Sequence, residues 1–348
     1  MDKNTSETNG DSVYYEGIDF LKGILIILVI IGHNKTGSLI DGFLVFTIYS
    51  FHMPLLVGIS GFLLNQQSIE NTNFSNLFKK YFYRLLLPWL IAWIVYYIIW
   101  GKEISIETMV ILFFFPLYHL WFVPAIFIFI IFTWFLKKFK TQNQIILIIS
   151  ITISLSWYFI YLSGHFDLSS YKLLYTYLKR VNRLRPYYLC FYVFGLYLRN
   201  VYIDLKYFKY VCALVISIFV IRRIFFYKGT TITLDGYILN FALILFSVLL
   251  VRKIKFEKYK IINWIGKNSL PIYLWHMAFL IRTHIERGLG VSLFVASMIN
   301  YCLMIGVIFL IFLLSKVDFI NKYVFGNTSE DTKSDLSLNS HENGFQES

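Results

Sequence analysis

The sequence predicts an all-α fold, that of a polytopic integral membrane protein with about ten transmembrane helices. Hydrophobic residues make up 57% of the 348 residues, charged residues only 15%, and mean hydropathy is +0.62. A soluble domain does not tolerate so apolar a composition. In addition, the apolar residues gather in runs of about 20, which is the length that spans a bilayer as a helix.

Ten apolar runs define the expected helices in chain order. The run 109–136 is too long for a plain span and contains Pro116 and Pro124. We therefore expect it to begin with an irregular piece packed inside the bundle. The ten runs are residues 18–34, 43–64, 84–100, 109–136, 144–162, 187–199, 209–227, 236–251, 269–285 and 292–315.

One membrane domain, residues 17–325, is expected between a short cytoplasmic segment, residues 1–16, and an acidic, disordered cytoplasmic tail, residues 326–348. The first run lacks a basic flank and a small-residue cleavage site, so it is expected to stay in the mature protein. The three cysteines lie in apolar runs and form no CxxC pair, which predicts neither a disulfide framework nor a zinc site.

The basic residues predict the orientation. The net charge is +12, but the 32 Lys and Arg residues fall mostly in short loops, as in membrane proteins, so no nucleic-acid partner is expected. If both termini are cytoplasmic, more of these Lys and Arg residues fall on the inner side of the membrane than on the outer side, as is typical of membrane proteins. We therefore expect a multi-pass protein of the cell membrane with both termini in the cytoplasm. The outer segment 163–186 is the exception. It contains Lys172, Lys179, Arg180, Arg183 and Arg185.

The ionisable residues in the first apolar run are the first candidates for functional residues. A charge in a membrane is costly, so its presence calls for a reason. Lys22 and His33 lie about three helical turns apart, roughly 16 Å along one face. Lys22 is either a functional cation near the inner surface or a side chain that snorkels to the headgroups. His33 needs a partner in the membrane and titrates near neutral pH, which suits acid–base chemistry.

The first run, IDFLKGILIILVIIGH, resembles the membrane acyltransferases of the acyltransferase-3 family, within it the group of fucose 4-O-acetylase-like proteins. Four further stretches are similar, and the resemblance covers the chain from Tyr15 to the tenth run. They are FHMPLLVGISGFLL (51–64), RLLLPW (84–89), HLWFVPA (119–125) and GKNSLPIYLWHM (266–277).

The resemblance implies an O-acetyltransferase, which moves acetyl or a related acyl group from acetyl-CoA to a hydroxyl of a cell-surface or exported polysaccharide, or of its lipid-linked precursor. It also implies that His33 is catalytic and that Lys22, an arginine in many members, contacts the donor. His33 could act as the general base or carry the acyl group itself, and the sequence leaves both open. Arg84, another inner-side cation, is a candidate for the phosphates of coenzyme A by charge.

Other polar and aromatic residues are candidates for lining a cavity. His52, His119 and His276 lie in apolar runs, but no two are three or four residues apart and no carboxylates accompany them, so no metal is expected. We expect them to be hydrogen-bonded groups at a cavity, with His119 near the substrate. Trp121 could line the same cavity or pack in the core.

The basic outer segment has two interpretations. Its apolar residues recur at helical spacing, so residues 169–182 are expected to form an amphipathic helix at the outer interface. This helix could rest on anionic lipid headgroups. Alternatively, Arg183 and Arg185 could face the cavity mouth and hold the acceptor.

Two rival functions remain. A transporter or flippase of polysaccharide units would also need polar groups in the membrane, but it should show repeated halves, which the sequence lacks. A polysaccharide polymerase or ligase would need a large outer loop with paired catalytic residues, whereas the longest outer segment is 163–186.

Overall fold

The helical architecture agrees with the predicted fold class. A computed structural model describes residues 17–33, 39–99, 118–162, 172–225, 233–254, 258–278 and 293–327, and every regular element in these residues is helical. Within them, six helices are long and apolar enough to cross a membrane. The count of about ten spans stays a prediction, since parts of the fourth and ninth expected spans lie outside the described residues.

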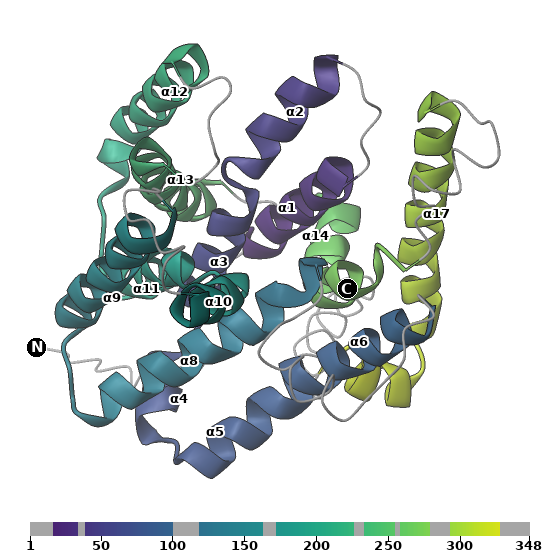
Figure 1. Cartoon of the computed structure of the whole chain (residues 1–348), viewed down its shortest axis with the longest axis horizontal. Helices are drawn as coiled ribbons and strands as arrows, with labels where there is room; N and C mark the ends of the chain where they lie inside the picture. The colour runs from purple at the N-terminus through teal and green to yellow at the C-terminus, as the bar shows by residue number, and fades with distance from the viewer. Residues whose placement is uncertain are drawn as a thin grey trace, which may run out of the picture.

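The helices that build the bundle are arranged as in Figure 1, with α1 and α3 in the middle, α12 and α13 on one side, and α17 on the opposite side. Their bounds are α1 Ile18–His33, α2 Leu39–Tyr49, α3 His52–Phe62, α4 Gln66–Asn71, α5 Phe74–Tyr81, α6 Leu87–Ile99, α8 Phe122–Lys138, α9 Asn143–Trp157, α10 Lys172–Val181, α11 Leu189–Arg199, α12 Phe208–Phe225, α13 Leu234–Lys253, α14 Lys260–Lys267, α15 Ser269–Trp275 and α17 Leu293–Leu314.

Three prolines lie where an α-helix begins, and a fourth follows a π-helical turn. Pro54, Pro124 and Pro271 each lie in the first turn of an α-helix, namely α3, α8 and α15. A first-turn residue has no intrahelical acceptor for its N–H group, so proline is tolerated there. Pro88 of α6 follows the π-helical turn Phe82–Leu86, in a helix that continues from Phe74 to Ile99. The part of the fourth expected span before Tyr118 lies outside the described residues, and a 3₁₀ turn, Tyr118–Trp121, leads into α8.

Glycines let two helix pairs approach at backbone distance. A Cβ added at Gly61 of α3 would collide with the carbonyl group of Tyr192 in α11, and one at Gly266 of α14 would collide with the carbonyl group of Asp19 in α1. Close approach of this kind is the usual use of small residues between membrane helices. The two pairs fix α1 and α3 against neighbours far away in the chain.

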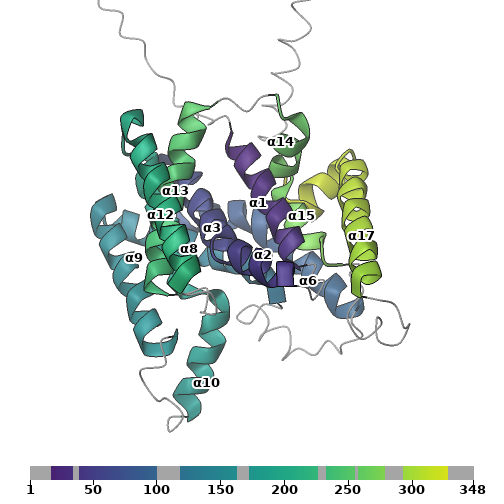
Figure 2. The same cartoon turned by 90° about the horizontal axis from the view of Figure 1, so that it is seen from above.

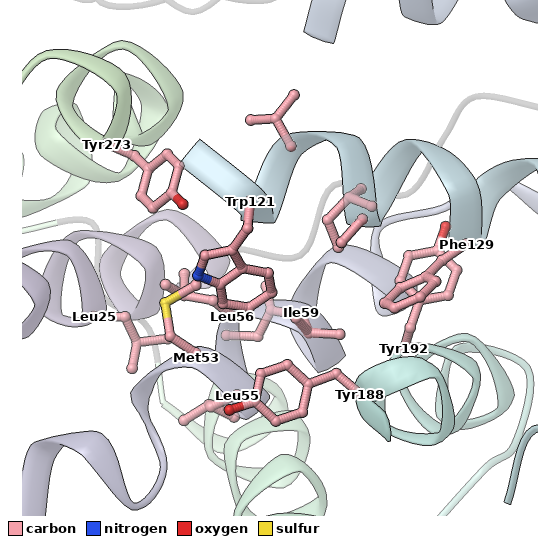
Figure 3. Close-up of a cluster of buried hydrophobic side chains, with 14 of the residues drawn as sticks. Leu25, Met53, Leu55, Leu56, Ile59, Trp121, Phe129, Tyr188, Tyr192 and Tyr273 are labelled. Atoms are coloured by element: carbon pink, nitrogen blue, oxygen red, sulfur yellow. The ribbon is translucent and has the colours of Figure 1, made fainter. Parts of the chain in front are cut away.

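A large apolar core surrounds the start of α8. Figure 3 shows the indole of Trp121, the last residue of the 3₁₀ turn before α8, pointing into a cluster that contains Met53 and Leu56 of α3 and Tyr188, which precedes α11. The predicted amphipathic helix is present as α10, and Figure 2 shows it projecting from the bundle below α8 and α9. Its position relative to a membrane stays a prediction.

Candidate functional site

Three imidazole rings meet where three segments end. His33 is the last residue of α1, His119 lies in the 3₁₀ turn before α8, and His276 directly follows α15. The ring centroids are 5.3 Å apart for His33 and His276, 5.1 Å for His119 and His276, and 6.3 Å for His33 and His119. We call these three residues the histidine cluster.

The cluster is buried, although its first member keeps a partly open side. His119 is 6% exposed and His276 is 1% exposed, whereas His33 is half-buried. Both ring nitrogens of His119 are buried, and the backbone of Leu274 interacts with the ring. The expectation that the buried histidines are hydrogen-bonded is met by His52, whose Nδ1 lies 2.6 Å from the carbonyl oxygen of Ile48.

Tyrosines form the walls of the cluster. The Tyr49 hydroxyl donates to the carbonyl oxygen of Gly32 over 3.2 Å and lies 3.5 Å from His33 Nδ1. On the other side, the Tyr96 ring of α6 is 5.4 Å from that of His119. The Tyr96 hydroxyl donates to the Leu274 carbonyl oxygen over 2.9 Å, which ties α6 to α15 next to the cluster.

Trp121 links the histidine cluster to Arg185. Trp121 lies two residues after His119 and is 9% exposed, and the Arg185 guanidinium lies 5.6 Å from the centre of its ring. Arg185 also donates from Nη1 to the Tyr187 hydroxyl over 2.8 Å. A guanidinium on an indole face is a favourable cation–π arrangement, so the arginine is held against the cluster side of the protein.

Arg183 and Arg185 differ although they are two residues apart. Arg185 is half-buried and has a left-handed backbone conformation with φ of 52°. Arg183 is exposed in the 3₁₀ turn Asn182–Leu184. The structure thus brings only one of the two predicted acceptor-binding arginines next to Trp121.

Lys22 lies in an ion pair. Its ammonium group is 2.8 Å from Asp19 Oδ1, three residues earlier on α1, and the two side chains are 20% and 8% exposed. The pair neutralises the charge of Lys22 locally, which explains how the first helix holds a lysine among apolar residues. A phosphate group at this lysine would share it with Asp19.

Arg84 lies away from the histidine cluster. It is an exposed residue of the π-helical turn Phe82–Leu86, which leads directly into α6. Tyr96, which lies at the cluster, is roughly 18 Å from Arg84 along the helix axis, because each residue adds about 1.5 Å. Arg84 and Lys22 thus each lie about one helix-length from the histidine cluster along their own helix.

Sequence reasoning missed the tyrosines and did not assign His276. Tyr49, Tyr96 and Tyr273 belong to a chain in which aromatic residues are 20% of the total, so composition does not distinguish them. His276 had a signal, since it lies in the similar stretch GKNSLPIYLWHM. In the described part of the chain, no group of three or more His, Cys, Asp or Glu side chains has an arrangement that could hold a metal ion.

The site thus combines imidazoles for proton transfer with an aromatic and cationic wall. A family model described as an acyltransferase domain, that of the acyltransferase-3 family, matches residues 15–317, which include the histidine cluster, Trp121 and Arg185. No curated protein and no solved structure matches the chain.

Proposed function

The chain belongs to the acyltransferase-3 family of membrane acyltransferases, and on that premise we propose that it moves an acyl group from coenzyme A to a polysaccharide. The acyl group is acetyl or a relative such as succinyl, and the acceptor is a hydroxyl of a cell-surface or exported glycan, as in the fucose 4-O-acetylase-like group. The proposed location is the cell membrane, with residues 17–325 as the acyltransferase domain and both termini in the cytoplasm.

The observation that supports this function most is the convergence of His33 with His119 and His276 at the end of α1. Attack of a hydroxyl on a thioester requires removal of the hydroxyl proton, and a neutral imidazole performs this near neutral pH. His33 is the least buried of the three rings, so it is the one that a substrate can reach. The Nε2 atom of His276 is buried without a hydrogen-bond partner among the described residues, which packing alone does not explain.

In the proposed reaction, His33 takes the proton of the acceptor hydroxyl as the oxygen attacks the thioester carbonyl. The carbon–sulfur bond then breaks, and the proton passes from His33 to the departing thiolate of coenzyme A. The alternative is a two-step route in which a His33 nitrogen attacks the thioester first and the acyl-imidazole is then transferred. Both routes balance and both require the same residue.

The donor would extend from the inner side toward the cluster. Lys22 and Arg84 lie roughly 16 Å and 18 Å back along their helices from His33 and Tyr96, respectively. An extended pantetheine arm covers a similar length between the phosphates and the thioester of coenzyme A. We propose that these two cations contact the donor phosphates by charge, Lys22 in competition with Asp19.

The acceptor would bind on the side of Trp121 and Arg185. An aromatic face is a common partner for the apolar face of a sugar ring, and the guanidinium supplies several hydrogen-bond donors to hydroxyl or carboxylate groups. His119 precedes Trp121 by two residues, and its ring centroid is 6.3 Å from that of His33, so it would line the acceptor pocket. Arg183, which is exposed, is proposed to contribute only to the outer rim.

The test uses His33→Ala in two settings. Purified protein in lipid nanodiscs would be given radiolabelled acetyl-CoA and de-O-acetylated surface polysaccharide, and the variant should transfer no label while its thermal unfolding stays near that of the wild type. In the cell, loss of the gene should remove acetyl groups and leave the polysaccharide on the surface. Wild-type acetylation by the variant, or loss of the polysaccharide itself, would contradict the proposal, the latter in favour of a transporter or polymerase.

A further inference from the structure

His276 is the most deeply buried member of the histidine cluster, and its protonation pattern follows from its hydrogen bonds. Its Nδ1 lies 2.8 Å from the carbonyl oxygen of Tyr273 and 3.2 Å from that of Ile272. A carbonyl oxygen only accepts hydrogen bonds, so Nδ1 has to carry the proton. In neutral imidazole the other nitrogen, Nε2, is then an acceptor with a lone pair.

This Nε2 lone pair has no hydrogen-bond partner among the described residues, although the atom is fully buried. Buried polar atoms in folded proteins are almost always paired, so an exception calls for an explanation. The titratable side chains whose rings lie around His276 are His33, His119 and Tyr273. Of these, the half-buried His33 is the one that a substrate can reach.

The ring separation permits a bond between His276 and His33. The centroids are 5.3 Å apart with an interplanar angle of 41°. Since each nitrogen lies on the rim of its ring, rotation of the His33 ring can bring one nitrogen of each residue to about 3 Å. Catalytic hydrogen bonds are commonly long before substrate binds and shorten in the complex.

We propose that His276 is a positioning residue, whose Nε2 accepts the hydrogen bond that holds His33 in its reactive tautomer. One His33 nitrogen carries its proton toward His276, which leaves the other with its lone pair toward the acceptor hydroxyl. When His33 takes the hydroxyl proton, the imidazolium is stabilised by the same bond. The proton leaves with the thiol of coenzyme A, and His276 keeps its own proton on Nδ1 throughout.

Two substitutions separate the functions of the two His276 nitrogens. The amide of asparagine takes the place of Nδ1, so His276→Asn keeps the donor to Tyr273 and removes the acceptor. The amide oxygen of glutamine takes the place of Nε2, so His276→Gln keeps an acceptor toward His33. The control is Thr133→Val in α8, because the Thr133 hydroxyl also donates to a backbone carbonyl four residues earlier, that of Phe129, and is 1% exposed, but lies 14 residues beyond His119 in the chain.

The inference rests on the proposed acyl transfer and is measured with acetyl-CoA and de-O-acetylated surface polysaccharide. We expect His276→Asn to lower kcat by roughly 10- to 100-fold, less than loss of a general base would, with the KM for acetyl-CoA within about twofold. His276→Gln should recover part of that kcat, and Thr133→Val should stay near wild type. Wild-type kcat in His276→Asn, no recovery in His276→Gln, or an equal loss in Thr133→Val would each overturn the proposal.

A second measurement does not depend on turnover. In ¹⁵N-histidine-labelled protein, the side-chain nitrogen shifts of His33 report which nitrogen carries the proton. They should change in His276→Asn and stay unchanged in Thr133→Val. Unchanged His33 shifts in His276→Asn would refute the positioning role. Absence of acyl transfer by the wild-type protein would instead refute the proposed function, and the shifts would still decide whether His276 positions His33.

Discussion

Replacing Arg185 by glutamine tests whether the wall next to Trp121 binds the acceptor. The guanidinium is 5.6 Å from the centre of the Trp121 ring and donates to the Tyr187 hydroxyl over 2.8 Å. Glutamine removes the charge and the planar fork. Arginine and glutamine have comparable difficulty with the left-handed backbone at this position, φ 52°, so the backbone cost is nearly unchanged.

The magnitude follows from the kind of bond that is lost. A hydrogen bond to a charged group contributes about 1.5–3 kcal/mol. If the acceptor uses one such bond to Arg185, kcat/KM for the polysaccharide should fall roughly 10- to 150-fold. The KM for acetyl-CoA should stay within about twofold, because the donor is proposed to approach from the Lys22 side.

The assay measures initial rates with radiolabelled acetyl-CoA, varying first the polysaccharide and then the donor. Arg183→Gln is the matched control, because it removes the same charge from an exposed position two residues away. Thermal unfolding shows whether loss of the bond to Tyr187 weakens the fold. An equal loss in Arg183→Gln, or a rise in the KM for acetyl-CoA alone, would refute the placement of the acceptor.

Two further predictions concern α1 and its neighbour α14. Lys22→Ala should raise the KM for acetyl-CoA roughly fivefold, which corresponds to about 1 kcal/mol. Lys22→Arg should keep wild-type kinetics, because the proposed contact to the donor depends on charge. Unchanged kinetics in Lys22→Ala would favour a lysine that only pairs with Asp19. Gly266→Ala should lower the stability by about 1–3 kcal/mol, because its Cβ collides with backbone of α1. Thermal unfolding in detergent measures this against Gly306→Ala, whose Cβ meets nothing within 4 Å; equal melting temperatures would contradict the close packing.

Local sequence determined the fold class and several details of the helices. Long apolar runs require backbone hydrogen bonds within each segment, so they could only be helices in a membrane. Pro54, Pro124 and Pro271 marked helix starts because proline lacks the N–H group that a helix interior needs. The pair of Lys22 with Asp19 was also within reach of the sequence, since residues three apart share a helix face.

The histidine cluster depended on the tertiary structure. His33, His119 and His276 come from three segments, and no periodicity in the chain relates them. The hydrogen bond from Tyr96 to Leu274 likewise joins distant parts of the chain, since the two residues are 178 positions apart. Sequence patterns report the face of one helix, whereas contacts between helices follow from how all their surfaces fit together.

Arg183 and Arg185 show most clearly what the sequence determined and what it could not. By residue type, charge and position in the chain the two are equivalent, and the sequence assigned them the same function. The left-handed backbone at Arg185 turns the chain so that this side chain lies on Trp121, while Arg183 stays exposed. The sequence by itself determined a helical membrane protein with a histidine at the end of its first apolar run. Only the tertiary structure decided which side chains surround that histidine, because burial and orientation depend on packing against residues far away in the chain.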